Sequence, residues 1–331
     1  MLTFFVKLVR AMLIIVMAIS SGFISPVTGA KEGNIKHQKE GCNASIAVIS
    51  DMHMKDNFIR QGMLELGYAD MASAEDKLDA VAFCGDITDH GYIDMWECFA
   101  EATAKYDLAE QLILVEGNHD TWGPDRDDLS TVKQTFIDYN KKVAGRDVTE
   151  MYYSTTVNGY PVIVLGSEGD HTSATVSQAQ IDWFAGEMEK ASETGLPIFI
   201  FCHQPFNKTH GLPKTWEMEK NPDWDDGGIG EASDTIKNIM KQYNNVFYIS
   251  GHIHAGFETE ASDLYSSVEK HNGYTLINVP CYMYPDVIRG GHITNGTGYV
   301  IEIYDDEVLL RARNFAASTW CTQYDVSVPL T

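Results

Sequence analysis

Short apolar runs alternate with amphipathic segments along most of the chain. Five runs have the length and the β-branched or aromatic content of buried strands; they are residues 45–50, 79–84, 111–115, 197–202 and 246–250. Segments with helical spacing of their apolar positions are found at residues 57–76, 92–106, 129–142 and 233–243. A further helix is expected after the candidate N-cap Ser177, with Ile181, Phe184 and Met188 on one face. Alternation of this kind is typical of α/β folds.

The second half of the chain also carries signals for antiparallel strands. Residues 152–156 and 161–165 flank the pair Asn158-Gly159, which accepts the positive φ of a tight hairpin turn. Near the C-terminus we expect strands at residues 274–279, 297–304 and 307–312, paired antiparallel. The whole pattern predicts an α/β sandwich in which a mixed sheet is completed by antiparallel strands.

The first thirty residues differ from the rest of the chain. Lys7 and Arg10 precede the apolar run 11–19, and small residues ending at Ala30 follow it. This order is typical of a secretory signal peptide. We therefore expect an exported protein with a signal peptide at residues 1–30, a flexible linker at 31–44 and one domain at 45–331. An uncleaved N-terminal anchor is the alternative interpretation of the apolar run.

Composition and charge narrow the possible partners. The chain has 331 residues, 44% of them hydrophobic, which is enough for a sizeable core. Its net charge is -23, and loss of Lys7 and Arg10 with the signal peptide would make it about -25. Such a surface argues against nucleic acid polymers and anionic membranes as partners. An anionic substrate would then need a local positive centre, which bound metal ions provide.

The six cysteines do not have the spacing of a zinc site. Cys84 and Cys202 lie in apolar strand-like runs and are expected to be buried. The other four could form disulfides in an oxidising compartment, in a pairing that the sequence does not determine; they are Cys42, Cys98, Cys281 and Cys321.

Polar residues able to bind metals follow each of the five strand-like runs. Carboxyl ends of parallel strands are where α/β sheets present functional side chains. Any one of these groups alone would be explained by ordinary hydrogen bonding, but five in order argue against that explanation. Their oxygen and imidazole ligands suit two divalent or trivalent metals, such as Mn, Fe or Zn, acting on a phosphate. The groups are Asp51 and His53, then Asp86, then Asn118, His119 and Asp120, then His203, and finally His252 and His254.

The spacing within two of the groups suggests how they share ions. Side chains at i and i+2 of an extended strand point the same way, so Asp51 and His53 could bind one ion. His252 and His254 have the same spacing and could each serve a different ion of a close pair. Asp86 has two carboxylate oxygens and could bridge both ions.

With these residues the chain resembles the calcineurin-like metallophosphoesterase superfamily. Its pattern is Asp-x-His, Gly-Asp-x-x-Asp, Gly-Asn-His-Asp/Glu, a lone His and Gly-His-x-His, and every block is present, the second at residues 85–89. The resemblance implies a β-sandwich of mixed sheets flanked by helices in four α/β/β/α layers. It also implies in-line attack on a phosphate ester by a metal-bound hydroxide.

The same resemblance implies a role for each residue. One metal ion would be bound by Asp51, His53, Asp86 and His254. The other would be bound by Asp86, Asn118, His203 and His252. His119 would act on the phosphate and the leaving oxygen, and Asp120 would orient the ring of His119.

Finer similarities suggest a subgroup. Purple acid phosphatases have Tyr where this chain has Asp89, so an iron–tyrosinate site is disfavoured. Residues 177–183, 229–233 and 313–315 are similar to exported bacterial relatives of class III cyclic-nucleotide phosphodiesterases. Our leading hypothesis is an exported two-metal phosphodiesterase that acts on small phosphodiesters, with cyclic nucleotides among the candidates. It would have no nucleic acid polymer and no stable membrane association as partners.

Two alternatives remain open from the sequence. A phosphomonoesterase or nucleotidase would use the same site, and a non-catalytic metal-binding scaffold would use the same fold. Several other residues could contact a substrate but are expected more often in loops or in the core. They are His90, His171, His210, His292, Tyr282, Tyr284 and the irregular stretch 205–230.

Overall fold

The structure is a computed structural model, which describes residues 27–123, 128–169, 172–212, 214, 227–258, 265–283 and 295–331. The predictions for most of the signal peptide, for His171, His292 and Tyr284, and for much of the stretch 205–230 lie outside these residues. Among the helices that the structure describes, none has the length and apolar content needed to cross a membrane.

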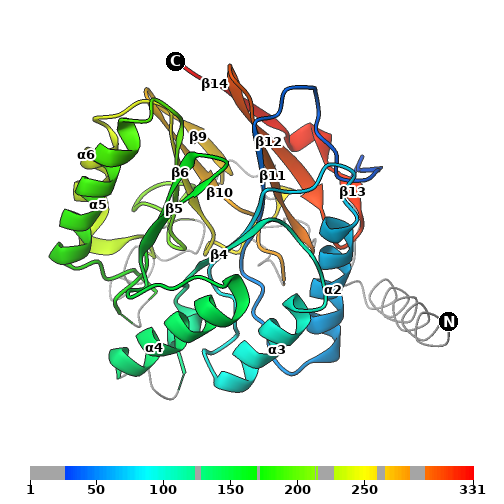
Figure 1. Cartoon of the computed structure of the whole chain (residues 1–331), viewed down its shortest axis with the longest axis horizontal. Helices are drawn as coiled ribbons and strands as arrows, with labels where there is room; N and C mark the ends of the chain where they lie inside the picture. The colour runs from blue at the N-terminus through cyan, green and yellow to red at the C-terminus, as the bar shows by residue number, and fades with distance from the viewer. Residues whose placement is uncertain are drawn as a thin grey trace.

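Two mixed β-sheets form the centre of the fold (Figure 1). Within the described residues, the first sheet has the strand order β1-β13-β12-β11-β2-β3-β4, with β14 added on β12. Strands β2, β3 and β4 are parallel, and β11 joins β2 antiparallel. The bounds are β1 Lys31–Glu32, β2 Ala44–Ile49, β3 Ala80–Cys84, β4 Gln111–Val115, β11 Thr297–Ile303, β12 Glu307–Asn314, β13 Thr319–Trp320 and β14 Val326–Pro329.

The second sheet has the order β5-β6-β7-β8-β10-β9. Its strands β6, β7, β8 and β10 are parallel, while β5 and β9 pair antiparallel at the two ends. The bounds are β5 Tyr153–Val157, β6 Tyr160–Val164, β7 Ile198–Phe201, β8 Val246–Ser250, β9 Val268–Lys270 and β10 Tyr274–Asn278.

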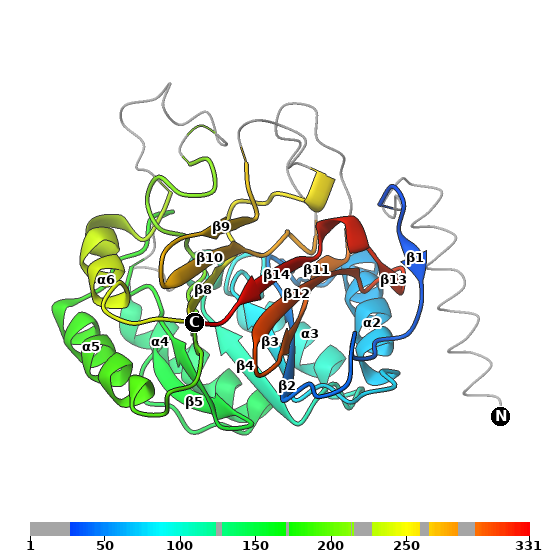
Figure 2. The ribbon, with the colours of Figure 1, turned by 90° about the horizontal axis from the view of Figure 1, so that it is seen from above.

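Helices cover the outer faces of the two sheets (Figures 1 and 2). Helices α2, α3 and α4 lie along the first sheet, and α5 and α6 lie beside the second. Helix α2 is N-capped by Asn57, and α5 by Ser177 as predicted. The fold is therefore the expected mixed α/β sandwich with helices on both sides. The bounds are α2 Phe58–Ala72, α3 Ile93–Thr103, α4 Leu129–Tyr139, α5 Gln178–Ser192 and α6 Ser233–Met240.

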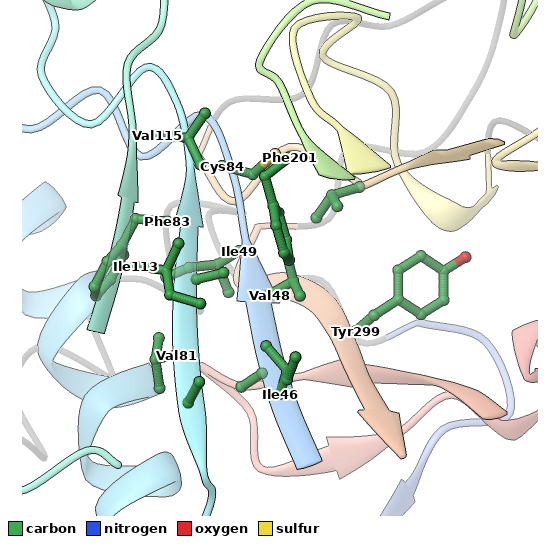
Figure 3. Close-up of a cluster of buried hydrophobic side chains, with 14 of the residues drawn as sticks. Ile46, Val48, Ile49, Val81, Phe83, Cys84, Ile113, Val115, Phe201 and Tyr299 are labelled. Atoms are coloured by element: carbon green, nitrogen blue, oxygen red, sulfur yellow. The ribbon is translucent and has the colours of Figure 1, made fainter. Parts of the chain in front are cut away.

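The inner strands β6, β7 and β8 of the second sheet are buried on both faces because each face packs against a different layer. Phe199 and Phe201 of β7 belong to the core between the sheets. Ile198 and Ile200 of the same strand belong to the core under α5 and α6. Figure 3 shows Phe201 beside residues of the first sheet, including Val48 and Cys84. A continuous apolar run in the sequence is thus the mark of a strand buried on two sides.

The C-terminal strands differ in part from the prediction of an antiparallel series. Strands β11 and β12 do pair antiparallel, but β10 belongs to the other sheet and lies parallel to β8. A parallel pair needs a long crossover connection, and residues 251–273 provide it between β8 and β10. The residue pattern of β10 does not reveal its parallel pairing with β8. The same apolar residues would be buried if β10 paired antiparallel with the C-terminal strands.

Residues 31–44, expected to be a linker, lie against the C-terminal strands in the structure. Strand β1 pairs antiparallel with β13. Arg311 donates a hydrogen bond of 2.6 Å to the carbonyl of Lys36, and Trp320 donates one of 3.1 Å to the carbonyl of Asn34. Ile35 is buried in the core. The segment therefore packs as part of the domain.

Candidate metal centre

The loops after β2, β3, β4, β7 and β8 converge at one end of the sandwich. These loops carry all nine predicted site residues, because the carboxyl ends of parallel strands lie at the same edge of a sheet. Among the described residues, three groups of side chains bring their ligand atoms within 4.8 Å of one another; His53, Asp89 and His119 form one of them, and the other two share Asp86. Of these two, the first is Asp51, His53, Asp86 and His254, and the second is Asp86, His203 and His252.

Asp86 is common to both groups. Its Oδ2 atom lies 3.7 Å from Nε2 of His53 and 3.2 Å from Nε2 of His203. In the first group, Nε2 of His53 and Nε2 of His254 are 3.1 Å apart. Two nitrogen ligands with metal–nitrogen distances of about 2.0–2.1 Å lie about this far apart. The arrangement therefore has the dimensions of two neighbouring cation sites joined by one carboxylate.

The backbone at these positions is strained. Positive φ angles of 57° at Asp51, 45° at His53, 48° at Asp86, 75° at His252 and 58° at His254 place them all in the left-handed region. Each such residue costs on the order of 1–3 kcal/mol, and clustering of this strain is typical of functional sites. The strand-alternation argument for the i, i+2 pairs is therefore wrong, because β2 ends at Ile49 and β8 at Ser250. Sharp turns beyond the strand ends aim these side chains.

Glycines next to the site residues allow the loops to pack closely. A Cβ atom added at Gly85 would collide with the ring of His203, and one at Gly117 with Asp86. At Gly251 it would collide with the hydroxyl of Ser50 and lie 2.7 Å from Oδ2 of Asp51. The glycines that precede three of the blocks are thus explained by close approach between loops.

Buried polar atoms at the site that make no hydrogen bond of good geometry among the described residues include Oδ1 of Asn118 and two atoms that face each other at 3.2 Å, Oδ2 of Asp86 and Nε2 of His203. Buried polar atoms are nearly always satisfied, so these need an explanation. All three are metal-ligand atoms by type, and metal ions between them would satisfy them together. The residues present therefore fit a pair of cations.

The protonation states of the histidines suit metal binding. Burial lowers the pKa of both His53 and His252 to about 3, so these imidazoles are neutral. The Nδ1 atom of His203 donates a 2.8 Å hydrogen bond to the carbonyl of Cys84, which directs Nε2 toward Asp86. Burial lowers the pKa of His203, but the carboxylates of Asp86 and Asp51 outweigh it and raise the pKa to about 9. A cation at Asp86 would therefore replace a proton.

His119 lies beside the first group. Its ring meets the ring of His53 edge-on with centroids 4.5 Å apart, and its backbone N–H donates a 2.8 Å hydrogen bond to Asp86. The Nδ1 atom lies 2.8 Å from the carbonyl oxygen of Asp89. Since a carbonyl accepts, Nδ1 carries the proton and Nε2 is the atom left for chemistry.

Asp120 does not have the contacts expected of a residue that orients His119. Its carboxylate accepts hydrogen bonds from the backbone N–H groups of Ile87, Thr88 and Gly117 and from the hydroxyl of Thr88, at 2.8–3.2 Å. These bonds join the loop after β3 to the loop after β4. Burial raises the pKa of Asp120 to about 6. In the structure it is the carbonyl of Asp89 that meets the ring of His119, and Asp120 fixes the loops.

Asp89 is a site residue that the sequence reasoning did not assign a role. Its carboxylate pairs with Lys55 and Arg60, each at 2.7 Å, and lies 3.6 Å from Nδ1 of His53. Despite the opposing effect of burial, the bonds to Lys55 and Arg60 lower its pKa to about 2. The second Asp of the Gly-Asp-x-x-Asp block was the available signal. Asp89 thus contacts both His53 and His119.

Two other candidates have structural contacts. Tyr282 is buried and donates a 2.9 Å hydrogen bond to the carbonyl of Met63 in α2. His210 is buried, with Nδ1 2.7 Å from the carbonyl of Ser266. His90, in contrast, is half exposed and lies near His119. All six cysteines are free thiols in the structure.

Comparisons with known proteins add to this geometry. A family model described as calcineurin-like phosphoesterase matches residues 44–256. A solved dimetal phosphatase from Danio rerio is similar over 88% of this chain and 100% of its own, with a TM-score of 0.56 and 12% identity, which shows a shared fold.

More distant structural similarity extends to two Thermus thermophilus proteins. TT1561 has a TM-score of 0.41 and 12% identity, over 87% of this chain and 99% of its own. The sulfate thiohydrolase SoxB has a TM-score of 0.44 and 10% identity, over 85% of this chain and 58% of its own. No curated protein matches the sequence at a significant level.

Proposed function

The chain belongs to the calcineurin-like phosphoesterase family, and on this basis we propose that it is an exported phosphodiesterase that hydrolyses small phosphodiesters with two metal ions. The family and the Asp/His groups support a metal-dependent phosphoesterase. The observation that carries the proposal is the meeting of two such groups at the shared carboxylate of Asp86. A carboxylate shared between two ions is the arrangement that two-metal hydrolysis needs.

Seven side chains would hold the ions in this proposal. Asp51, His53, Asp86 and His254 would bind one, while Asp86, Asn118, His203 and His252 would bind the other. The bound ions would neutralise phosphate charge and activate water. His119 would place Nε2 near the leaving oxygen, with Nδ1 held by the carbonyl of Asp89. Mn, Fe and Zn all suit these ligands.

The charge around the site favours diesters over monoesters. A phosphodiester has one negative charge, whereas a phosphomonoester has about two near neutral pH. Two cations close to the groups, Lys55 and Arg60, both pair with Asp89. The whole chain has a net charge of -23. A substrate with the smaller charge therefore meets less repulsion, and cyclic nucleotides have this property.

Export is supported by the sequence order of Lys7, Arg10, an apolar run and small residues up to Ala30. A small phosphodiester outside the cytoplasm would be the substrate, without a nucleic acid polymer or a membrane as partner. The acidic composition agrees with both exclusions.

A direct test compares two chromogenic substrates on protein stripped of metal and reloaded with Mn, Fe or Zn. We expect bis-p-nitrophenyl phosphate to be hydrolysed with a higher kcat/KM than p-nitrophenyl phosphate, and only after reloading. His119→Ala and Asn118→Ala should each lower kcat/KM, whereas His271→Ala, an exposed histidine beside Tyr274, should not. Unchanged hydrolysis in both site variants would refute the proposed site. Preference for the monoester would refute the diester assignment.

A further inference from the structure

Large apolar side chains are exposed mainly around the entrance to the candidate site. Four of the six found in the described residues are at or next to the first residue of a helix, and a fifth lies three residues after His119. Because α2, α3 and α4 follow β2, β3 and β4, their first residues lie at the edge that carries the site. The five are Phe58, Tyr92, Ile93, Trp122 and Leu129, and the sixth is Leu196.

Aromatic rings form a connected row that begins at the candidate site. The ring of His119 meets His53 edge-on at 4.5 Å and Trp122 edge-on at 4.8 Å between centroids. His90 is nearly parallel to Trp122, with an interplanar angle of 19° and centroids 5.9 Å apart. Tyr92 lies 6.4 Å from His90. We call His119, Trp122, His90 and Tyr92 the aromatic row.

The outer rings of this row are far more exposed than His53, the proposed metal ligand that contacts its inner end. His53 is 5% exposed, while Trp122 is 43% and Tyr92 42% exposed. A row that begins beside a buried ligand and ends in half-exposed indole and phenol rings leads out of the site. A substrate whose leaving oxygen lies at His119 would therefore extend its leaving group over Trp122 and His90.

We propose that the aromatic row binds a planar ring in the leaving group of the substrate, which makes the enzyme selective for phosphodiesters of nucleosides. This inference rests on the proposed function and specifies its substrate class. Exposed tryptophan and histidine rings bind nucleic acid bases by stacking. Stacking discriminates little between the bases, because every base has a π-face. Trp122 and His90 thus act as residues of specificity and take no part in bond breaking.

The cavity beside the row agrees with a ring bearing polar groups. It has a volume of about 260 Å³ and is lined by Tyr92, Asp94, Thr131 and Thr135 among others. Sites for drug-sized ligands are usually about 300–1,000 Å³, so this cavity suits one ring system and not a long chain. The carboxylate of Asp94 and the two hydroxyls can accept hydrogen bonds from amino and hydroxyl groups of a nucleoside.

The charge of the protein separates a nucleoside ester from the polymers that contain the same bases. With a net charge of -23, the protein repels a nucleic acid strand with many phosphates. A neutral base next to one phosphodiester meets no such barrier. The expected ligand is therefore a small nucleotide ester, and not RNA or DNA.

The test uses inhibitors that differ only in the base. AMP and ribose 5-phosphate share the sugar and the phosphate, and inorganic phosphate reports on the metal site alone. Each is measured as an inhibitor of bis-p-nitrophenyl phosphate hydrolysis by the metal-loaded protein. We expect AMP to inhibit at least about fivefold more strongly than ribose 5-phosphate, the smallest effect typical of one stacked base.

Variants assign that difference to the row. Trp122→Ala should remove the advantage of AMP, and Trp122→Phe should keep most of it, while inhibition by phosphate is unchanged in both. Leu196→Ala is the matched control, because Leu196 is exposed but precedes β7, at the end of that strand opposite His203. Equal inhibition by AMP and ribose 5-phosphate in an active wild-type protein would overturn this inference and leave the proposed function intact.

Two further outcomes would contradict the binding of a base by the aromatic row. A long-chain alkyl phosphate that inhibits more strongly than AMP and is weakened equally by Trp122→Ala would show that the row binds apolar chains, against the proposal. Absence of any metal-dependent hydrolysis would overturn the proposed function and this inference with it.

Discussion

The Nε2 atom of His203 lies 3.2 Å from the Oδ2 atom of Asp86, with both side chains fully buried. The carbonyl of Cys84 binds the other ring nitrogen of His203, so the imidazole cannot turn away. Without a cation, the carboxylates hold a proton on His203, whose pKa is raised to about 9. A cation bound at Asp86 would displace that proton from His203. The pair therefore links metal binding to proton release.

Metal affinity should accordingly rise with pH. Below pH 9 the metal-free protein keeps a proton on His203 that a cation must displace, so binding strengthens as pH increases. One displaced proton corresponds to about a tenfold change in Kd per pH unit. Titration calorimetry with Mn²⁺ at pH 6, 7 and 8, in buffers of different ionisation enthalpy, measures both the affinity and the protons released. A pH-independent Kd with no proton release would contradict the link.

Asp89 should act on metal binding through His53. Asp89→Ala removes the carboxylate near Nδ1 of His53, together with the ion pairs that this carboxylate forms with Lys55 and Arg60. The backbone carbonyl that meets His119 remains. We expect metal affinity to fall about 10–100-fold, as for other groups that orient a metal-binding histidine. Asp56→Ala, which removes an exposed carboxylate on the loop that carries His53, is the control in the calorimetric measurement and should leave Kd unchanged. Equal affinities for both variants would show that Asp89 does not position His53.

The residues of the candidate site could be predicted from the sequence because their chemistry is local. Strand ends are marked by apolar runs, and the polar residues that follow them are few. The left-handed backbone at Asp51, Asp86 and His252 could not be foreseen, since it results from contacts between loops that are far apart in sequence. The contacts of Asp120 and Asp89 depend on the same loop packing.

For the fold, too, local features were predicted from the sequence, whereas contacts between distant segments were not. The bounds predicted for β4 and β8 coincide with those in the structure, and the other long strands differ by one or two residues. The parallel partner of β10 and the packing of residues 31–44 were missed. Both depend on which distant segments meet, for example Trp320 with Asn34, and residue patterns within a segment carry little of that information.

A buried ion pair should contribute strongly to stability away from the site. Arg313 of β12 donates two hydrogen bonds, of 2.7 and 2.6 Å, to Asp70 of α2, and both side chains are buried. Arg313→Met would leave the carboxylate of Asp70 without its cation and lower the free energy of unfolding by about 3–5 kcal/mol. Lys77→Met, which breaks exposed pairs with Asp107 and Glu110, should change it far less, because water and salt screen exposed ion pairs. Urea unfolding of the metal-free variants measures both.

The double variant Asp70→Leu/Arg313→Met gives the decisive comparison. Replacing both partners by apolar side chains leaves no buried charge unpaired, so we expect it to be more stable than Arg313→Met alone. If the double variant is less stable than Arg313→Met, packing and not charge pairing is the contribution of these residues.

The absence of a side chain at Gly251 should be essential for the first cation site, the one formed by Asp51, His53, Asp86 and His254. The position of Gly251 leaves no room for a Cβ atom between the hydroxyl of Ser50 and the carboxylate of Asp51. Gly251→Ala would push Asp51 out of place and weaken the two 3.2 Å hydrogen bonds that Asp51 accepts from the backbone of His252. We therefore expect loss of metal affinity and hydrolysis with the fold retained, checked by metal content, kcat/KM and circular dichroism.

The matched control for Gly251 is a glycine inside a helix. Gly186 lies in α5, and an added Cβ there would meet nothing within 4 Å. Gly186→Ala should raise the free energy of unfolding by about 0.5–1 kcal/mol, since alanine loses less backbone entropy in a helix, and should leave metal content unchanged. Both variants replace glycine by alanine, but only Gly251→Ala places the new methyl group against the site. A loss of metal binding in that variant alone therefore results from the close contact at Gly251. If Gly251→Ala bound two metal ions as tightly as the wild type, the close contact of the loops after β2 and β8 would not be what holds Asp51 in position.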